Sequence, residues 1–285
     1  MKDATGAALV LGGGGLLGGA WTIGMLAGLA QEGVDLTGAD LILGTSMGAV
    51  TGARLAAGQH LDRLYAAELA GGSPVDVTVT AGQTARYLWA ALGSRDPERA
   101  IRRLGRAALA ARTVPEAEVF AAVDTLLDGV RDWPRRDVRF AAVDALSGAL
   151  RTFGVRSGVS LTEAVAVSCA VPLVWPAVTL DGRRWMDGGT RSTANVHLAH
   201  GYGRVVALAP VPKAVGPHPD ARTQGAELAA AGSRVSVLTP DRAARRAIGR
   251  NLLDPRRRTA AARAGHAQGV TSAPAVAGVW HRQDA

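Results

Sequence analysis

The chain begins with two consecutive units of strand, turn and helix, and this pattern constrains its fold more than any other feature. Residues 7–11 form a short, continuous apolar run, and Asp40 opens a second expected strand over 40–43 whose residues 41–43 are apolar. Such runs are typical of strands buried on both faces of a parallel sheet. A glycine loop over 12–19 and an uncharged helix over 20–31 follow the first run, and a helix over 48–57 follows the second. Strands that alternate with helices predict an α/β fold whose central sheet is mostly parallel.

The rest of the chain extends this pattern. We expect strands over 138–143, 149–155, 178–180, 184–186, 204–209 and 234–238, and helices over 115–127, 160–170, 241–252 and 255–268. Residues 58–115 are rich in alanine and arginine and indicate a helical insertion near the mouth of a substrate site. The expected organisation is one domain over 5–270, in which 241–268 form basic C-terminal helices, followed by a disordered tail over 271–285.

The composition allows a large core, because 48% of the 285 residues are hydrophobic and 20% are charged. Residues 4–31 carry no charge, as in a signal peptide or a membrane span. Nine glycines between positions 6 and 28, together with the strand, loop and helix pattern, favour a buried segment instead. The single cysteine, Cys169, excludes an internal disulfide and fits a reducing compartment, so we expect a cytoplasmic protein.

The positive charge is concentrated toward the C-terminal end. The net charge is +8, and residues 241–285 contain nine arginines and three aspartates. A basic segment is attracted to anionic lipid surfaces and to nucleic acid, although it can also be a solvated helix face. Few aromatic side chains accompany these arginines, so we expect no nucleic-acid binding. We expect instead peripheral contact with an anionic membrane surface, on the inner face of the membrane.

Residues 44–48 have the pattern G-x-S-x-G, in the order Gly44-Thr45-Ser46-Met47-Gly48. They follow an apolar run and precede a helix-like stretch, which is the strand–turn–helix context of a nucleophile elbow. A serine at such a sharp turn has crowded backbone angles, and Gly44 and Gly48 remove the Cβ atoms that would collide there. The Ser46 hydroxyl is then exposed at the end of the sheet, beside the positive end of a helix.

The glycine loop after the first strand has two interpretations. It contains G-x-G-x-x-G from Gly13 to Gly18, as in a dinucleotide-binding loop. That site needs an acidic residue at the end of the next strand, whereas here the next strand leads into the serine turn. The favoured interpretation is an oxyanion hole, in which backbone N–H groups of the glycine run stabilise the negative charge on an ester carbonyl oxygen.

A serine hydroxyl needs a base before it can attack an ester. The chain has six histidines, none in a distinctive setting: His60, His197, His200, His218, His266 and His281. Asp187 is the better candidate, because it follows a strand-like segment and is followed by Gly188 and Gly189. By itself this pattern also fits an ordinary turn aspartate. No cluster with metal-ligand spacing is visible, so we expect no metal and no other cofactor.

The glycine loop, the G-x-S-x-G turn and the Asp-Gly-Gly triplet, in this order, resemble the patatin-like phospholipases. The likeness covers roughly residues 7–210. It includes the segment 166–176, Asn195 and the strand over 203–209. The family commonly has a basic residue where this chain has Leu17, and that difference removes a charge near the glycine loop.

The resemblance implies a three-layer α/β/α fold and a catalytic dyad without histidine. Ser46 would be the nucleophile and Asp187 the base, and the N–H groups of Gly13, Gly14 and Gly15 would form the oxyanion hole. A free aspartate, with a pKa of about 3.9, is a weak base toward a serine. The dyad therefore requires partial burial of Asp187 to raise its pKa.

The resemblance also implies a serine-dependent hydrolase of carboxylic esters with fatty acyl chains, and we expect phospholipid or lysophospholipid first. The alternatives are a short-chain esterase or thioesterase, an acyltransferase on the same dyad, and a non-catalytic lipid-binding regulator. Val171, Leu173, Val174 and Trp175 are candidates for the apolar wall of the substrate site, although each also fits the protein core.

Overall fold

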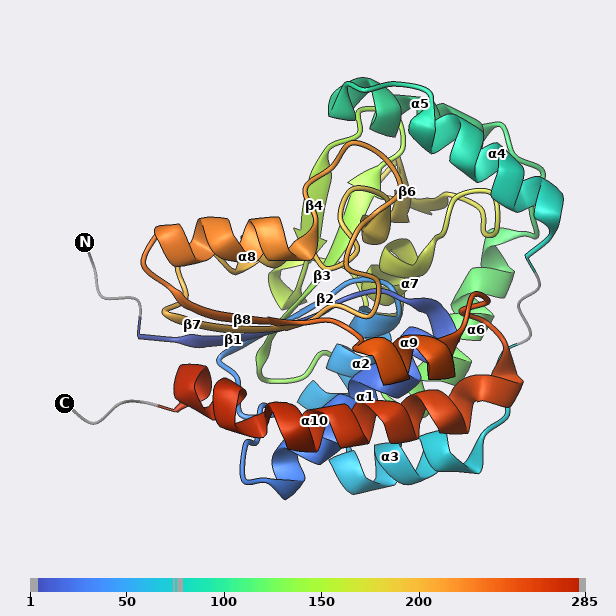
Figure 1. Cartoon of the computed structure of the whole chain (residues 1–285). Helices are drawn as coiled ribbons and strands as arrows, with labels where there is room; N and C mark the ends of the chain where they lie inside the picture. The colour runs from blue at the N-terminus through green and yellow to red at the C-terminus, as the bar shows by residue number, and fades with distance from the viewer. Residues whose placement is uncertain (1–4, 74, 76–78, 282–285) are drawn as a thin grey trace.

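The computed structural model describes residues 5–73, 75 and 79–281. Within these residues, an eight-stranded sheet is covered by helices on both faces, which gives three layers (Figure 1). The strands are β1 (Ala7–Leu11), β2 (Leu41–Gly44), β3 (Asp137–Asp144), β4 (Leu150–Phe153), β5 (Val178–Leu180), β6 (Arg183–Asp187), β7 (Arg204–Leu208) and β8 (Arg234–Leu238).

The helices connect these strands and include four short 3₁₀ turns within the described residues. The α-helices are α1 (Gly15–Gln31), α2 (Met47–Ala56), α3 (Leu61–Ala70), α4 (Ala81–Leu92), α5 (Pro97–Leu109), α6 (Glu116–Leu127), α7 (Leu161–Cys169), α8 (Ala221–Ala230), α9 (Arg242–Ile248) and α10 (Arg258–Trp280). The 3₁₀ turns are η1 (Val155–Ser157), η2 (Gly188–Thr190), η3 (Val196–Ala199) and η4 (Pro255–Arg257).

The sheet is mostly parallel, which confirms the fold class predicted from the sequence. The strand order is β5-β6-β3-β2-β1-β7-β8, and β4 pairs with β3 outside this path. β1, β2, β3, β7 and β8 are parallel, whereas β4, β5 and β6 pair antiparallel. Side chains alternate across β1, so that Leu9 and Leu11 enter the larger core with α1 and α2, and Ala8 and Val10 enter a second core with α8.

Helix α1 is buried almost completely because α10 packs along it (Figure 1). Gly24 and Gly28 of α1 lie so close to α10 that a Cβ at either position would collide with a backbone carbonyl of that helix. Gly265 and Gly269 of α10 make the same close approach to α1. A helix without a solvated face must be apolar all round, which explains why the helical residues 15–31 carry no charge. No helix in the described part of the chain is long and apolar enough to cross a membrane.

The prediction of a disordered tail over 271–285 is wrong for residues 271–280, which are helical. α10 continues to Trp280, with Pro274 inside the helix. The indole Nε1 of Trp280 donates to the carbonyl oxygen of Asp35 at 2.9 Å and fastens the end of the helix to the body. Residues 282–285 lie outside the described part of the chain.

Three other boundaries differ from the sequence-based prediction. α1 begins at Gly15, so the glycine loop comprises only residues 12–14, and α9 ends at Ile248. Pro115 caps α6 and does not lie in its first turn. The insertion over 58–115 contains α3, α4 and α5, and the last two form a hairpin at one end of the molecule (Figure 1).

Candidate functional site

Ser46 lies at a sharp turn between β2 and α2. Its backbone has φ 54° and ψ −125°, a conformation that non-glycine residues rarely adopt and that costs on the order of 1–3 kcal/mol. A Cβ at Gly44 would lie 2.5 Å from the Cα of Ala49, and a Cβ at Gly48 would collide with the carbonyl oxygen of Leu11. The turn therefore needs both glycines for the steric reason expected from the sequence.

A buried serine that the sequence analysis did not single out holds this turn in place. The N–H of Ser46 donates to Oγ of Ser168 at 3.0 Å. The Ser168 hydroxyl in turn donates to the carbonyl oxygen of Ala141 in β3 at 2.8 Å. Ser168 lies in α7 and is fully buried. It ties the serine turn to the sheet and positions Ser46, and no local sequence signal marks this role.

Asp187 ends β6, and its carboxylate is buried beside Ser46. Strand pairing places Asp187 opposite Ala142 of β3, the neighbour of β2. The residue is only 4% exposed, and its Oδ1 accepts the N–H of Gly189 at 2.6 Å. Burial raises the pKa of Asp187 from 3.8 to about 6, and hydrogen bonding to the Ser46 side chain and the Gly189 amide offsets part of the rise. Such a carboxyl is ionised at neutral pH yet basic enough to exchange protons with a reacting group.

Asn195 connects the serine turn to the loop after Asp187. Its buried side chain donates from Nδ2 to Oγ1 of Thr45 at 3.1 Å and to the carbonyl oxygen of Gly188 at 3.3 Å. Its own backbone is left-handed, with φ 53°, a conformation that asparagine tolerates better than most residues. Asn195 therefore holds the two loops that carry Ser46 and Asp187 against each other.

Backbone N–H groups of the glycine loop lie next to the serine turn. The N–H of Gly13 already donates to the carbonyl oxygen of Thr193 at 2.7 Å. Within the described residues, the N–H groups of Gly14 and Gly15 have no such backbone partner and lie at the N-terminus of α1. The N–H of Met47, which directly follows the serine, has none either. Of the three glycine N–H groups expected as donors, those of Gly14 and Gly15 therefore have no backbone partner within the described residues, and the N–H of Met47, which was not expected from the sequence, has none either.

Leu17 is fully buried in the core, so the position where the family commonly has a basic residue faces the protein interior here. Its N–H donates to the carbonyl oxygen of Leu252 at 2.9 Å. A backbone carbonyl therefore lies against the first turn of α1, where a dinucleotide site presents N–H groups to a pyrophosphate. This contact argues against the dinucleotide interpretation of the glycine loop.

Ser46 and Asp187 line one cavity of about 230 Å³. Gly13, Gly14, Gly15 and Gly189 also line it. Tyr87 of α4 reaches the same cavity, and burial together with the charge of Asp187 raises the pKa of its hydroxyl. Tyr87 is therefore protonated at neutral pH and able to donate a hydrogen bond into the site. The insertion contributes this side chain, and no sequence signal indicated it.

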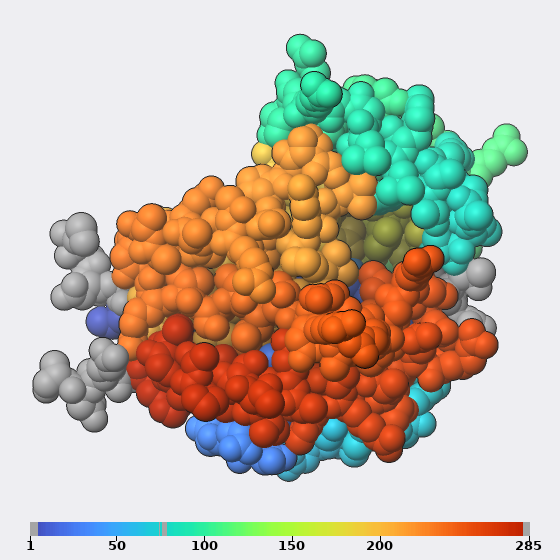
Figure 2. Space-filling view, in the orientation of Figure 1, coloured from blue at the N-terminus to red at the C-terminus, as the bar shows by residue number. Residues whose placement is uncertain are grey.

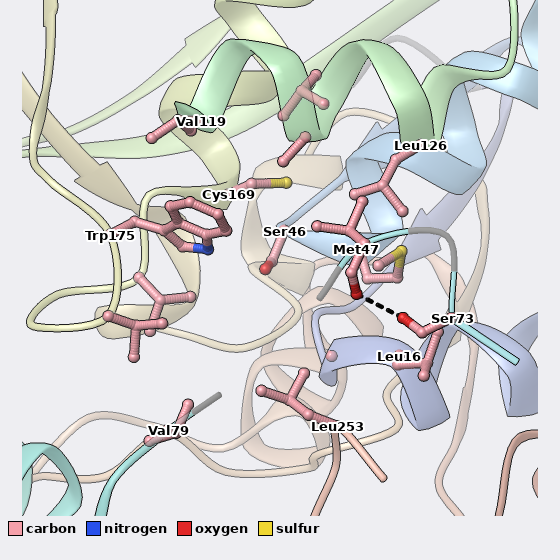
Figure 3. A pocket seen from close by; sticks show the side chains of 16 residues that line it. Leu16, Ser46, Met47, Ser73, Val79, Val119, Leu126, Cys169, Trp175 and Leu253 are labelled. Atoms are coloured by element: carbon pink, nitrogen blue, oxygen red, sulfur yellow. Dashed lines mark hydrogen bonds between the residues drawn. The ribbon is translucent and has the colours of Figure 1, made fainter. Parts of the chain in front are cut away.

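A second cavity, of about 150 Å³, also opens at Ser46 and is almost entirely apolar (Figure 3). The Ser46 side chain points into the space between the labelled apolar residues in Figure 3. Of the four residues expected to form an apolar wall, Val171, Val174 and Trp175 line this cavity, whereas Leu173 does not and is buried elsewhere. Cys169 lines it too, and burial raises the pKa of its thiol.

The six histidines line neither of these two cavities in the described part of the chain. His266 stacks on Tyr65 with ring centroids 5.1 Å apart, and burial together with the charge of Arg191 lowers the pKa of His218. Among the described residues there is also no cluster of three or more His, Cys, Asp or Glu side chains that could hold a metal ion.

A family model described as patatin-like phospholipase matches residues 9–200. No curated protein sequence matches the chain. Among solved structures, VipD from Legionella pneumophila is similar with a TM-score of 0.47 and 12% identity, over 96% of this chain and 67% of that one. The type III effector protein ExoU is similar with a TM-score of 0.40 and 13% identity, over 96% of this chain and 53% of that one, so the chain spans about half of its length.

Proposed function

The chain belongs to the patatin-like phospholipase family, and on this premise we propose that it is a lipid acyl hydrolase with Ser46 as nucleophile and Asp187 as base. The observation that carries the proposal is that both side chains line one cavity, next to free backbone N–H groups. The raised pKa of Asp187, about 6, makes its carboxylate a stronger base than a free aspartate. No histidine of the described chain lines that cavity, so Asp187 is the candidate base.

The reaction would proceed in two steps. In the first, Asp187 takes the proton of the Ser46 hydroxyl while Oγ bonds to the ester carbonyl carbon, and the N–H groups of Gly14, Gly15 and Met47 are the candidate donors to the oxygen that becomes negative. The ester C–O bond then breaks, and Asp187 returns the proton to the departing alcohol. In the second step, water gives a proton to Asp187 and attacks the acyl-Ser46 carbonyl, and the released Ser46 oxygen regains the proton.

The apolar cavity beside Ser46 favours an ester with an aliphatic acyl chain. Val171, Val174 and Trp175 line it together with residues of α6, and this surface gains little from a polar acyl group. Phospholipid or lysophospholipid is the substrate class we propose first. Short-chain esters, thioesters and acyl transfer to another alcohol remain testable on the same dyad, because they differ only in the leaving group or the final acceptor.

The proposal is tested by labelling with a fluorophosphonate probe and by hydrolysis of a panel of esters with increasing acyl length. Wild-type protein should be labelled and should turn over esters, whereas Ser46→Ala should do neither. Asp187→Asn should lower kcat by on the order of 10³–10⁴, while His218→Ala should retain activity. Unchanged labelling and turnover in Ser46→Ala would exclude Ser46 as the nucleophile.

A further inference from the structure

Helix α4 exposes apolar side chains on its outer face. Leu88, Trp89 and Leu92 are 39%, 69% and 62% exposed. Successive residues of an α-helix are rotated by about 100°, so these three side chains lie on one side of α4. Ala90 and Ala91 are buried on the opposite side. A helix that packs one face on the protein and leaves leucine and tryptophan on the other is suited to contact an apolar or interfacial environment.

Arginines surround this apolar face. Residues 81–112 contain seven arginines and two acidic residues. Both acidic side chains are already engaged: Asp96 caps α5, and Glu98 pairs with Arg191. Apart from Arg99, which pairs with Asp96 at 3.5 Å, the arginines of the α4–α5 hairpin have no acidic partner within the hairpin, so a surplus of positive charge remains.

Three of these arginines and the exposed tryptophan form a surface cleft. Arg86, Arg103 and Arg106 line it together with Trp89. The guanidinium carbon of Arg103 lies 3.6 Å from the centroid of the Trp89 ring. The Nε of Arg103 is buried and therefore closed to a ligand, but within the described residues none of these three arginines forms an ion pair, because the acidic residues of the hairpin pair with Arg99 and Arg191. Three guanidinium groups without an acidic partner suit a phosphate group.

The hairpin also borders the entrance to the site of Ser46. Ala81 and Thr84 of α4 line a groove that continues past Val171 to Arg250 and Arg256 on the other side. Figure 2 shows a hollow between the α4–α5 hairpin and the chain around α9. A lipid surface resting against α4 would therefore lie beside the opening through which an acyl chain reaches Ser46.

We propose that the outer face of α4 and the arginines of the α4–α5 hairpin dock on an anionic lipid bilayer. Trp89 and Leu92 would enter the headgroup region, and Arg86, Arg103 and Arg106 would bind lipid phosphates. The expected role of this surface, to bring the site to its lipid substrate, rests on the proposed lipid hydrolase function. The binding to a bilayer does not itself require catalysis.

This surface differs from the one expected from the sequence, which was the basic C-terminal region. Several arginines there already have partners within the protein, although of these only Arg258 is buried. Arg258 forms a buried ion pair with Glu68 at 2.6 Å, and Arg256 pairs with Asp254 at 3.0 Å. Arg257 donates to two backbone carbonyls at the end of α9. The hairpin has both arginines without an acidic partner and exposed apolar side chains. By contrast, α9 has no large hydrophobic residue exposed in the described structure, so the hairpin is the better candidate for the docking surface.

The test measures the binding of the full chain to vesicles, by sedimentation. Vesicles of ether-linked phosphatidylcholine and phosphatidylglycerol contain no acyl ester, so hydrolysis does not affect the result. The wild type should bind the anionic mixture more tightly than pure ether-linked phosphatidylcholine. One arginine near an anionic membrane contributes a factor of about five, so Arg86→Gln with Arg106→Gln should weaken binding about 25-fold. The matched pair Arg242→Gln with Arg246→Gln, on α9, should change it much less.

The apolar contribution has its own matched control. Leu92→Ser should weaken vesicle binding about tenfold. Val155→Ser changes a side chain of similar exposure, 58% against 62%, on a different part of the surface and should leave binding unchanged. Unaltered melting temperatures show that the variants are folded. The proposal is overturned if the α9 pair weakens binding as much as the hairpin pair, if Leu92→Ser binds like the wild type, or if neutral vesicles bind as tightly as anionic ones.

Discussion

Replacement of Asp187 by asparagine should lower turnover severely and yet make the protein more stable at neutral pH. Burial raises the pKa of the Asp187 carboxyl from 3.8 to about 6, so the folded protein holds this proton more tightly than the unfolded chain. The free energy of unfolding therefore falls as the pH rises from about 4 to about 6. Above that range the buried Asp187 carboxylate lowers the free energy of unfolding by its full amount.

The size of the effect follows from the two pKa values. One pKa unit corresponds to about 1.4 kcal/mol, so the ionised carboxylate destabilises the fold by about 3 kcal/mol at pH 8 and by about 1.5 kcal/mol at pH 5. Asparagine has nearly the same shape and keeps an oxygen for the N–H of Gly189, but it carries no charge. With a typical unfolding entropy for 285 residues, 3 kcal/mol corresponds to a rise in Tm of about 5 °C.

The assay is chemical denaturation of the wild type and Asp187→Asn between pH 5 and pH 8. The difference in unfolding free energy should grow with pH, and Asp181→Asn, in the exposed β5–β6 turn, is the matched control for the same replacement outside the site. In the wild type, kcat/KM should rise with pH to a plateau with a midpoint near 6, because only the ionised carboxylate accepts a proton. An asparagine variant that is no more stable than the wild type at pH 8 would refute the reasoning.

Three further predictions concern the turn and the acyl cavity. Ser168→Ala removes a bridge that is bonded at both ends, and it should cost about 1–3 kcal/mol of unfolding free energy and lower kcat with little change in KM. Gly48→Ala should prevent formation of an active fold, because its Cβ would collide with backbone, whereas Gly38→Ala, with open space around it, should melt like the wild type. Ala122→Phe would fill much of the cavity of about 150 Å³, so kcat/KM should fall for long acyl esters and persist for acetate esters, measured across the ester panel.

Local signals were enough to predict most of the sheet and the serine turn. β1 and β2 are continuous apolar runs, and the glycines around Ser46 are required by sterics within a few residues. The capping box of α7, in which Ser160 and Glu163 bond to each other's backbone, and the turn that joins β5 to β6 also depend only on neighbouring residues. The helix boundaries in the insertion over 58–115 were the hardest to predict from the sequence, because contacts with distant segments position these helices.

The hydrogen bonds and contacts that assemble the candidate site could not be predicted, because each joins residues that lie far apart in the sequence. Ser168 meets the backbone of Ser46 across 122 residues, and Asn195 meets Thr45 across 150. Nothing near Tyr87 in the sequence indicates that it lines the cavity of Asp187. Such contacts arise only when separate loops converge at one edge of the sheet.

The sequence alone determined the order of strands and helices and the position of the serine, because steric and hydrophobic preferences act over a few neighbouring residues. The tertiary structure alone decided that α10 continues to Trp280 against α1, that the Asp187 carboxyl is buried enough to raise its pKa, and that the N–H of Gly13 is already bonded. Burial and long-range hydrogen bonds depend on which segments meet in space, and no single stretch of the chain contains that information.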